Sequence, residues 1–348
     1  MRPYIFNKSN LSAYLKQLDT VFEVWIPVTE NGITTFNLFN KQNDIDLGKI
    51  PRTSVKSFFL PQHELLMEYS ASPDSIQLDE CLPSKKRIIF GVKPCEGRAV
   101  KLNSQLLVPE TKYQKQDLYF KANQQNTILI AYGCNQPGVG CFCRSTGGDP
   151  FGKTGLDAIV TDLGDRLLLE TTGTEISNQL IPKNDLNEEA TESDLTAAEQ
   201  IKKNACKVLD ERSEIKVSKE NIHTVFDLEI WKETAMRCLN CGICTYLCPT
   251  CSCFDMMDYF EDGKGSQSRC WDSCMFSLFT QHSLGHNPRP SKKERVRQRF
   301  LHKLRYYPEH HNGEISCVGC GRCVLHCPVN IDIREIADRL SLNGGERG

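Results

Sequence analysis

The sequence C-L-N-C-G-I-C-T-Y-L-C-P at residues 238–249 recurs in form as C-V-G-C-G-R-C-V-L-H-C-P at residues 317–328. Both runs have the C-x2-C-x2-C-x3-C-P spacing by which bacterial proteins bind pairs of [4Fe–4S] clusters. Three closely spaced thiols can surround one cubane, and glycines within the runs let the backbone pass close to its inorganic sulfide. The proline after the fourth cysteine fixes a turn, so that the fourth thiol is directed to the other cluster.

The fourth cysteine of each run is therefore predicted to bind the cluster of the other run. One cluster is expected to have the ligands Cys238, Cys241, Cys244 and Cys327, and the second Cys317, Cys320, Cys323 and Cys248. A zinc ribbon and a set of disulfides are the alternative interpretations. Zinc usually takes four ligands as two pairs, and two complete four-cysteine runs exceed that number.

Length, composition and charge place the chain among soluble proteins. It has 348 residues, enough for two domains, with 39% hydrophobic and 25% charged residues. A net charge of −2 argues against general binding to nucleic acid. The first ten residues lack the apolar core of a signal peptide, and no stretch approaches the roughly 20 apolar residues of a membrane helix. We expect a cytoplasmic protein without membrane insertion, in which eighteen cysteines indicate metal or redox chemistry.

The N-terminal part has the pattern of an α/β domain. A helix is expected near residues 11–18, within a mixed segment of short apolar runs and turns. Residues 87–92 and 127–132 are continuous apolar runs, typical of parallel strands buried on both faces. Residues 158–161 and 167–169 are predicted to form a hairpin that completes the sheet.

Four cysteines are expected at one end of that sheet. Cys95 and Cys134 each follow a predicted strand, and open α/β sheets bind ligands beyond the carboxyl ends of their strands. Cys141 and Cys143 lie on a glycine-rich loop shortly after. The four thiols could hold a third iron–sulfur cluster, a zinc ion, or simply be buried thiols. An iron–sulfur cluster is favoured because the rest of the chain already has the pattern of an iron–sulfur protein.

An acidic, polar segment from residue 183 to 199 marks the expected domain junction. We predict an α/β domain with the possible third cluster at residues 1–182, an acidic linker with connecting helices at 183–236, and an α-helical ferredoxin-type domain binding two [4Fe–4S] clusters at 237–348. Between the two cysteine runs, residues 254–260, 275–284 and 292–304 are predicted to be helical. The basic stretch from residue 289 to 305 is interpreted as a solvated helix face or a contact for an acidic partner or for the acidic linker.

Four more cysteines lie between the runs, at Cys251, Cys253, Cys270 and Cys274. They could bind a further cluster. Neither half of this set shows the three-cysteine spacing of a cluster-binding run, however. At least one of Cys251 and Cys253 is expected to lie beside the cluster bound by Cys248, because both follow it closely.

These residues together resemble a family of iron–sulfur electron-transfer subunits, represented by the iron–sulfur subunit of anaerobic sulfite reductase and the beta subunit of cytosolic sulfhydrogenases. The resemblance covers most of the chain and is strong from about residue 237 to 334. It rests on the segments at 91–96, 141–143, 248–253, 271–274, 285–287, 302–303 and 317–323. Cys270 departs from the family pattern.

The resemblance implies an electron-transfer subunit of a hetero-oligomeric, anaerobic oxidoreductase complex. Its partners would be a subunit that binds flavin and NAD(P)H, and a separate catalytic subunit of the sulfite reductase, hydrogenase or heterodisulfide-reductase type. The alternative is a catalytic subunit in which a cluster with an open coordination site acts directly on substrate. An all-cysteine set of ligands favours electron transfer, whereas a missing fourth ligand favours the enzyme.

Overall fold

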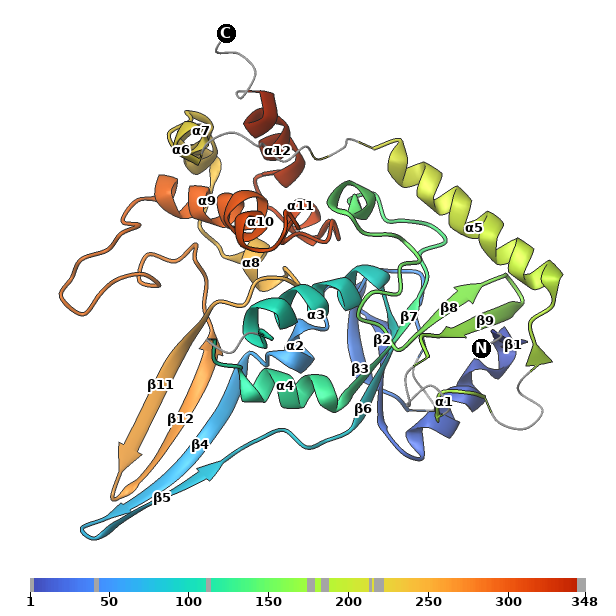
Figure 1. Cartoon of the computed structure of the whole chain (residues 1–348), viewed down its shortest axis with the longest axis horizontal. Helices are drawn as coiled ribbons and strands as arrows, with labels where there is room; N and C mark the ends of the chain where they lie inside the picture. The colour runs from blue at the N-terminus through green and yellow to red at the C-terminus, as the bar shows by residue number, and fades with distance from the viewer. Residues whose placement is uncertain are drawn as a thin grey trace.

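The computed structural model describes residues 3–40, 44–110, 114–173, 179–182, 188–212, 215 and 222–342. The N-terminal half contains a mixed sheet of eight strands, β1 (Tyr4–Asn7), β2 (Glu23–Glu30), β3 (Ile33–Leu38), β6 (Arg87–Val92), β7 (Thr127–Tyr132), β8 (Ala158–Asp162), β9 (Arg166–Thr171) and β10 (Glu188–Glu189). Their order is β10-β1-β9-β8-β7-β6-β2-β3, and β2, β6, β7 and β8 run parallel (Figure 1). The predicted parallel strands at 87–92 and 127–132 and the hairpin β8–β9 are thereby confirmed.

Helices cover both faces of this sheet because its central strands are apolar on both sides. Helix α1 (Leu11–Asp19), which confirms the predicted opening helix, follows a short η1 turn (Lys8–Asn10) and packs Tyr14 and Leu15 against one face. The other face is covered by α2 (Lys56–Phe59), α3 (Pro94–Leu107), α4 (Leu118–Gln125) and α5 (Glu192–Asp210). Because β2, β6, β7 and β8 run parallel, their carboxyl ends meet at one edge of the sheet. Cys95 and Cys134, two of the candidate thiols, follow strands at this edge.

The cysteine runs lie in a second, mainly helical group. Its helices are α6 (Ile222–Phe226), α7 (Ile230–Arg237), α8 (Ile243–Tyr246), α9 (Lys292–Leu301), α10 (Tyr307–His310), α11 (Arg322–Leu325) and α12 (Ile333–Leu342). Ser291 and Glu294 form a capping box at the start of α9. A π-helical turn, η5 (His302–Tyr306), follows α9 directly, and such turns are frequent at functional sites. The predicted helix at 292–304 is thus confirmed.

The other two helices predicted between the runs are wrong. Residues 254–260 belong to a hairpin of β11 (Phe254–Glu261) and β12 (Lys264–Trp271), and residues 275–284 form turns and bends. The hairpin turn is Asp262-Gly263, with φ of 49° and 78°, and two left-handed residues of this type make the type I′ turn of a tight hairpin. The C-terminal part is therefore not all-helical.

That hairpin forms a sheet with a second hairpin from the N-terminal half, β4 (His63–Ser72) and β5 (Ser75–Glu80). The strand order is β11-β12-β4-β5, all antiparallel. This four-stranded sheet projects away from the rest of the protein, at the lower left of Figure 1. We call it the arm. It joins the segment between the cysteine runs to the N-terminal half.

A buried arginine holds the base of the arm. Arg269 on β12, 4% exposed, donates to Glu64 Oε2 at 2.6 Å and to Asp117 at the start of α4. Replacing it by leucine leaves two carboxylates without their cation, which is expected to lower the free energy of unfolding by about 3–5 kcal/mol. Urea denaturation under anaerobic conditions measures this loss. Lys264→Leu at the exposed tip of the same strand is the control, with a change within about 0.5 kcal/mol. Equal stability of the two variants would contradict the assignment.

Candidate metal centres

The first cysteine run surrounds a cavity at the start of α8. Gly242 precedes the helix with a φ of 73°, a conformation that suits glycine, and lets the chain fold back around the cavity. The thiol-bearing residues that line the cavity are Cys238, Cys241, Cys244, Cys323 and Cys327. Backbone amides point at two of these thiols, from Asn240 to Cys238 Sγ at 3.4 Å and from Ile331 to Cys327 Sγ at 3.2 Å.

The second run surrounds a smaller cavity at the start of α11. Its thiol-bearing residues are Cys248, Cys317, Cys320 and Cys323, and Cys323 lines both cavities. The hydroxyl of Thr250 lies 3.3 Å from Cys248 Sγ. The two cavities are therefore direct neighbours, and each is lined by the fourth cysteine of the opposite run.

The thiols of each set influence one another. Burial raises the pKa of Cys238, and the nearby thiolates of Cys244, Cys241 and Cys327 raise it further. Burial likewise raises the pKa of Cys323 to about 12, with Cys317, Cys248 and Cys320 among the causes. Four such thiols cannot ionise together without a positive centre between them, which an iron–sulfur cluster provides.

Buried cations from α9 and the π-helical turn face the same cavities. Arg299 lines both of them, is 3% exposed, and its Nε and Nη1 have no hydrogen-bond partner among the described residues. Lys303 lines the second cavity and donates to Thr250 Oγ1 at 2.9 Å. Burial opposes the charge of Lys303, but the thiolates of Cys248 and Cys251 nevertheless raise its pKa above the usual range. Buried positive groups beside thiolates fit an anionic cluster.

The basic stretch was therefore misinterpreted in part from sequence. Arg295, Arg299 and Lys303, spaced four residues apart, are 6%, 3% and 3% exposed and lie on the inner side of the helix rather than on a solvated face. Lys56 on α2 is a further buried cation near Cys251 and Cys248, and its ammonium lies 3.9 Å from the centre of the Trp271 ring. No sequence pattern indicated Lys56, because it comes from the other half of the chain.

The four N-terminal cysteines also lie near one another. Cys95 is in the first turn of α3, Cys134 follows β7, and Cys141 and Cys143 lie at the start of the short helix η2 (Cys143–Thr146). Burial raises the pKa of Cys143 to about 12, with the thiolates of Cys134 and Cys141 as the next causes. Cys134 in turn contributes to the raised pKa of Cys95. The arrangement suits a third centre.

This N-terminal set contacts the second cysteine run. The amide of Phe142 donates to the carbonyl of Gly319 at 2.8 Å. A Cβ at Gly321, which has a φ of 75°, would lie 2.4 Å from the carbonyl oxygen of Gly140, so only glycine fits this approach. Cys320 is also among the groups that raise the pKa of Cys95. The glycines of the second run thus bring the two sets of thiols close together.

The number of thiols in each set bears on which metal group the set can hold. In the part of the chain that the structure describes, no three His, Cys, Asp or Glu side chains converge enough to hold a single metal ion. A [4Fe–4S] cubane takes one thiolate at each of its four iron corners, which is the number that each proposed set of cysteines provides.

Of the remaining cysteines between the runs, Cys251, Cys253 and Cys274 lie near one another, whereas Cys270 lies apart. The Cys251 thiol donates a hydrogen bond to Cys248, and the Cys274 thiol donates one to Cys253; all four residues are near Lys56 or Arg299. Cys270 instead lies on β12, with its Sγ 3.2 Å from Met257 Sδ. Cys251 thus lies beside Cys248, whereas the expectation that it adjoins a cluster bound there stays a prediction.

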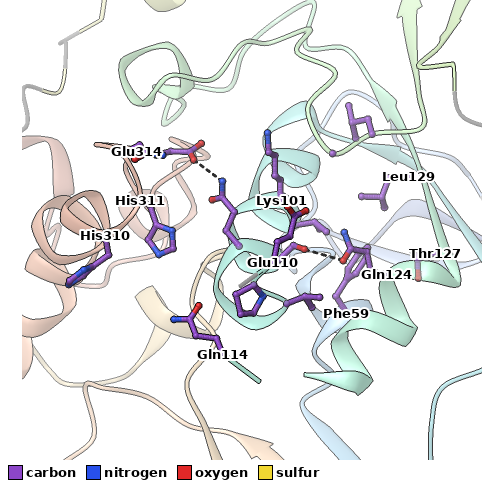
Figure 2. Close-up of a pocket in the computed structure, with 18 of the residues that line it drawn as sticks. Phe59, Lys101, Glu110, Gln114, Gln124, Thr127, Leu129, His310, His311 and Glu314 are labelled. Carbon is purple, nitrogen blue, oxygen red and sulfur yellow. Dashed lines mark hydrogen bonds between the residues drawn. The ribbon is translucent and has the colours of Figure 1, made fainter. Parts of the chain in front are cut away.

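A large open cavity of about 1180 Å³ lies between α3, α4 and the segment after α10 (Figure 2). Its lining includes Lys101, Glu110, His310 and His311, but no cysteine. Several of its polar side chains bond to each other, as Gln105 does to Glu314 at 3.2 Å and Ser104 to Gln124 at 3.2 Å. This cavity is separate from the thiol sets.

Comparisons with known proteins agree with these features. Residues 237–331 match the family model described as a 4Fe-4S dicluster domain. The chain is 27% identical to "Sulfhydrogenase 2 subunit beta" of Pyrococcus furiosus over 334 residues, covering 94% of this chain and 95% of the relative. No solved structure matches. Across the described residues, none of the helices has the length and apolar character needed to cross a membrane.

Proposed function

We propose that this chain is an electron-transfer subunit of an oxidoreductase complex. Its resemblance to iron–sulfur subunits is confirmed, and it contains a 4Fe-4S dicluster domain. It would pass electrons between two other subunits, one that binds flavin and NAD(P)H and one that is catalytic. The main support is the pair of adjacent thiol-lined cavities that share Cys323. Neighbouring centres of this kind suit electron transfer rather than substrate binding.

The proposed ligands follow the crossed pattern of the two runs. One cluster is bound by Cys238, Cys241, Cys244 and Cys327, and the other by Cys317, Cys320, Cys323 and Cys248. The lining of each cavity supports this, since each contains the four cysteines of its proposed set. Cys95, Cys134, Cys141 and Cys143 are proposed to hold a third centre.

The three sets of thiols are arranged in series. The set with Cys238 lies beside the set with Cys317, and the N-terminal set contacts the latter through Gly319 and Gly321. At one end Cys241 is the one exposed cysteine among the eighteen. At the other end Cys134 lines an open cavity of about 690 Å³ together with Lys93 and Tyr132. Both ends of the series thus reach the surface.

Each cluster, when bound, supplies a one-electron carrier whose charge is spread over iron and sulfide. The chain holds such a group in fixed geometry through four thiolates and excludes water from the middle of the series, where Cys317 and Cys320 are 7% and 8% exposed. The amides of Asn240 and Ile331 donate to sulfur and stabilise the reduced, more negative state. Arg299 and Lys303 act in the same direction. The centre bound by Cys317, Cys320, Cys323 and Cys248 is therefore expected to be readily reduced.

Iron analysis and electron transfer of the anaerobically purified full chain test this function. We expect about eight iron atoms and as much sulfide per chain, or about twelve with the third centre. The protein should pass electrons from a reduced viologen to an oxidised dye, without consuming sulfite or hydrogen by itself. Zinc in place of iron would contradict the proposal, and turnover of sulfite or hydrogen by the isolated chain would favour the alternative enzyme.

A further inference from the structure

The arm has two distinct faces, which follow from its strand register. Leu78 pairs with Tyr69, Tyr69 with Gly265, and Gly265 with Phe260, so these residues lie in one row across all four strands. Because alternate residues of a strand point to the same face, Ile76 and Met256 lie on the same face as this row. We call Tyr69, Ile76, Leu78, Met256 and Phe260 the arm patch.

The arm patch is apolar and uncovered. Ile76, Leu78 and Phe260 are 70%, 63% and 58% exposed, and Met256 is 41% exposed. The rings of Tyr69 and Phe260 stack across Gly265 with centroids 5.9 Å apart and planes 8° apart. A Cβ at Gly265 would lie 2.2 Å from the Tyr69 ring, so glycine is needed for this stacking. A continuous exposed apolar face of this kind marks an interaction surface.

The charges around the arm patch are almost all negative. The exposed acidic residues of the arm are Glu68, Asp74, Asp79, Glu80, Asp255, Asp258, Glu261 and Asp262. Between residues 65 and 80 and between 254 and 268, Lys264 is the one exposed base. On the face of the patch, Glu80 and Asp258 flank it on the two edge strands, and Asp74 and Asp262 lie at the two turns. An apolar centre is thus surrounded by carboxylates.

This charge pattern selects among the possible occupants. A second copy of the chain would bring Glu80, Asp258 and the two turn aspartates against the same carboxylates of its partner, and an anionic lipid surface would also be repelled. We propose that the arm patch is the docking surface for another protein subunit of the complex, one that presents an apolar patch surrounded by lysine or arginine. This inference rests on the proposed function, since it names where a partner of the electron-transfer subunit binds.

The base of the arm connects this surface to the thiols. Strand β11 begins directly after Cys253, and β12 ends three residues before Cys274. An eight-residue strand spans about 26 Å, so the arm reaches well beyond the body of the protein while its base stays beside Cys248–Cys253. A subunit that binds the arm patch and extends along the arm to its base would therefore reach the middle of the thiol series.

Photo-crosslinking in the intact complex tests the inference. The tagged full chain, carrying p-benzoylphenylalanine at position 260, is isolated from its source cells under anaerobic conditions. We expect a crosslink to a peptide of one partner subunit, with lysine or arginine flanking the crosslinked residue. The same label at position 259 is the matched control, because Tyr259 is equally exposed at 59% but lies on the opposite face of the same strand. It should give little or no crosslink to that subunit.

Substitutions provide the second measurement. Phe260→Ser should weaken retention of the partner subunit about tenfold or more, while Tyr259→Ser leaves it unchanged. Both variants should keep the iron content of the wild type, which shows that the fold is intact. Suppose that the complex still forms and transfers electrons, but position 260 crosslinks to a second copy of the chain, to lipid or to no partner. This result would overturn the docking surface alone. Failure of the wild-type chain to co-purify with any subunit would overturn the partner part of the proposed function as well.

Discussion

Cys327→Ala is expected to remove the cluster bound by Cys238, Cys241 and Cys244, although Cys327 belongs to the other run in sequence. The chain should lose about four iron atoms and keep the cluster of Cys317, Cys320 and Cys323. The reason is geometric, since Cys327 lines the first cavity and is absent from the lining of the second. Iron analysis with electron paramagnetic resonance of the dithionite-reduced protein measures the loss.

The reciprocal variant makes this test specific. Cys248→Ala should remove the other cluster, because Cys248 lines the second cavity and contributes to the raised pKa of Cys317 and Cys320. The two variants should therefore leave different residual spectra, each the complement of the other. If Cys327→Ala instead removed the cluster of its own run, the crossed pattern of ligands would be wrong.

The parts of the fold that sequence predicted are those governed by local spacing. The cysteine runs could be predicted because a cubane needs three thiols within one short loop. The buried strands at 87–92 and 127–132 are readable because strands covered on both faces are continuously apolar. Cys95 and Cys134 follow from these strands, since a strand end fixes the position of the next residues along the chain.

The parts that sequence did not predict depend on contacts between distant segments. The pairing of Gly265 with Tyr69 joins residues almost 200 positions apart, and nothing local to either strand indicates it. The hairpin at 254–271 did carry a local signal, the turn residues Asp262-Gly263. The apolar run before this turn was interpreted as helical, and that interpretation obscured the signal. Sequence placed Arg299 and Lys303 on a solvated face because charged side chains are rarely buried without a partner. Their partners here are thiols from distant segments, which only the fold places beside them.

Cys143→Ser is expected to remove or weaken the N-terminal centre and to leave the two clusters of the cysteine runs in place. Serine keeps the size of the side chain, and with it the packing of this loop on Gly319, but its hydroxyl does not ionise to replace the thiolate. Because burial raises the pKa of Cys143 to about 12, its thiolate depends on a positive centre in this site. The full chain should lose up to about four iron atoms.

Cys206→Ser is the matched control for this last variant. Cys206 lies on α5, near the same loop, with its Sγ 3.7 Å from the carboxylate of Asp149, but it belongs to none of the proposed ligand sets. It should retain all iron, and its reduced spectrum should equal that of the wild type. If Cys143→Ser also kept all iron and an unchanged spectrum, the four N-terminal thiols would be packing residues, and the series of centres would consist of the two clusters alone. A loss confined to Cys143→Ser would instead extend the series to the cavity beside Cys134, and would give the chain a second surface from which electrons can leave.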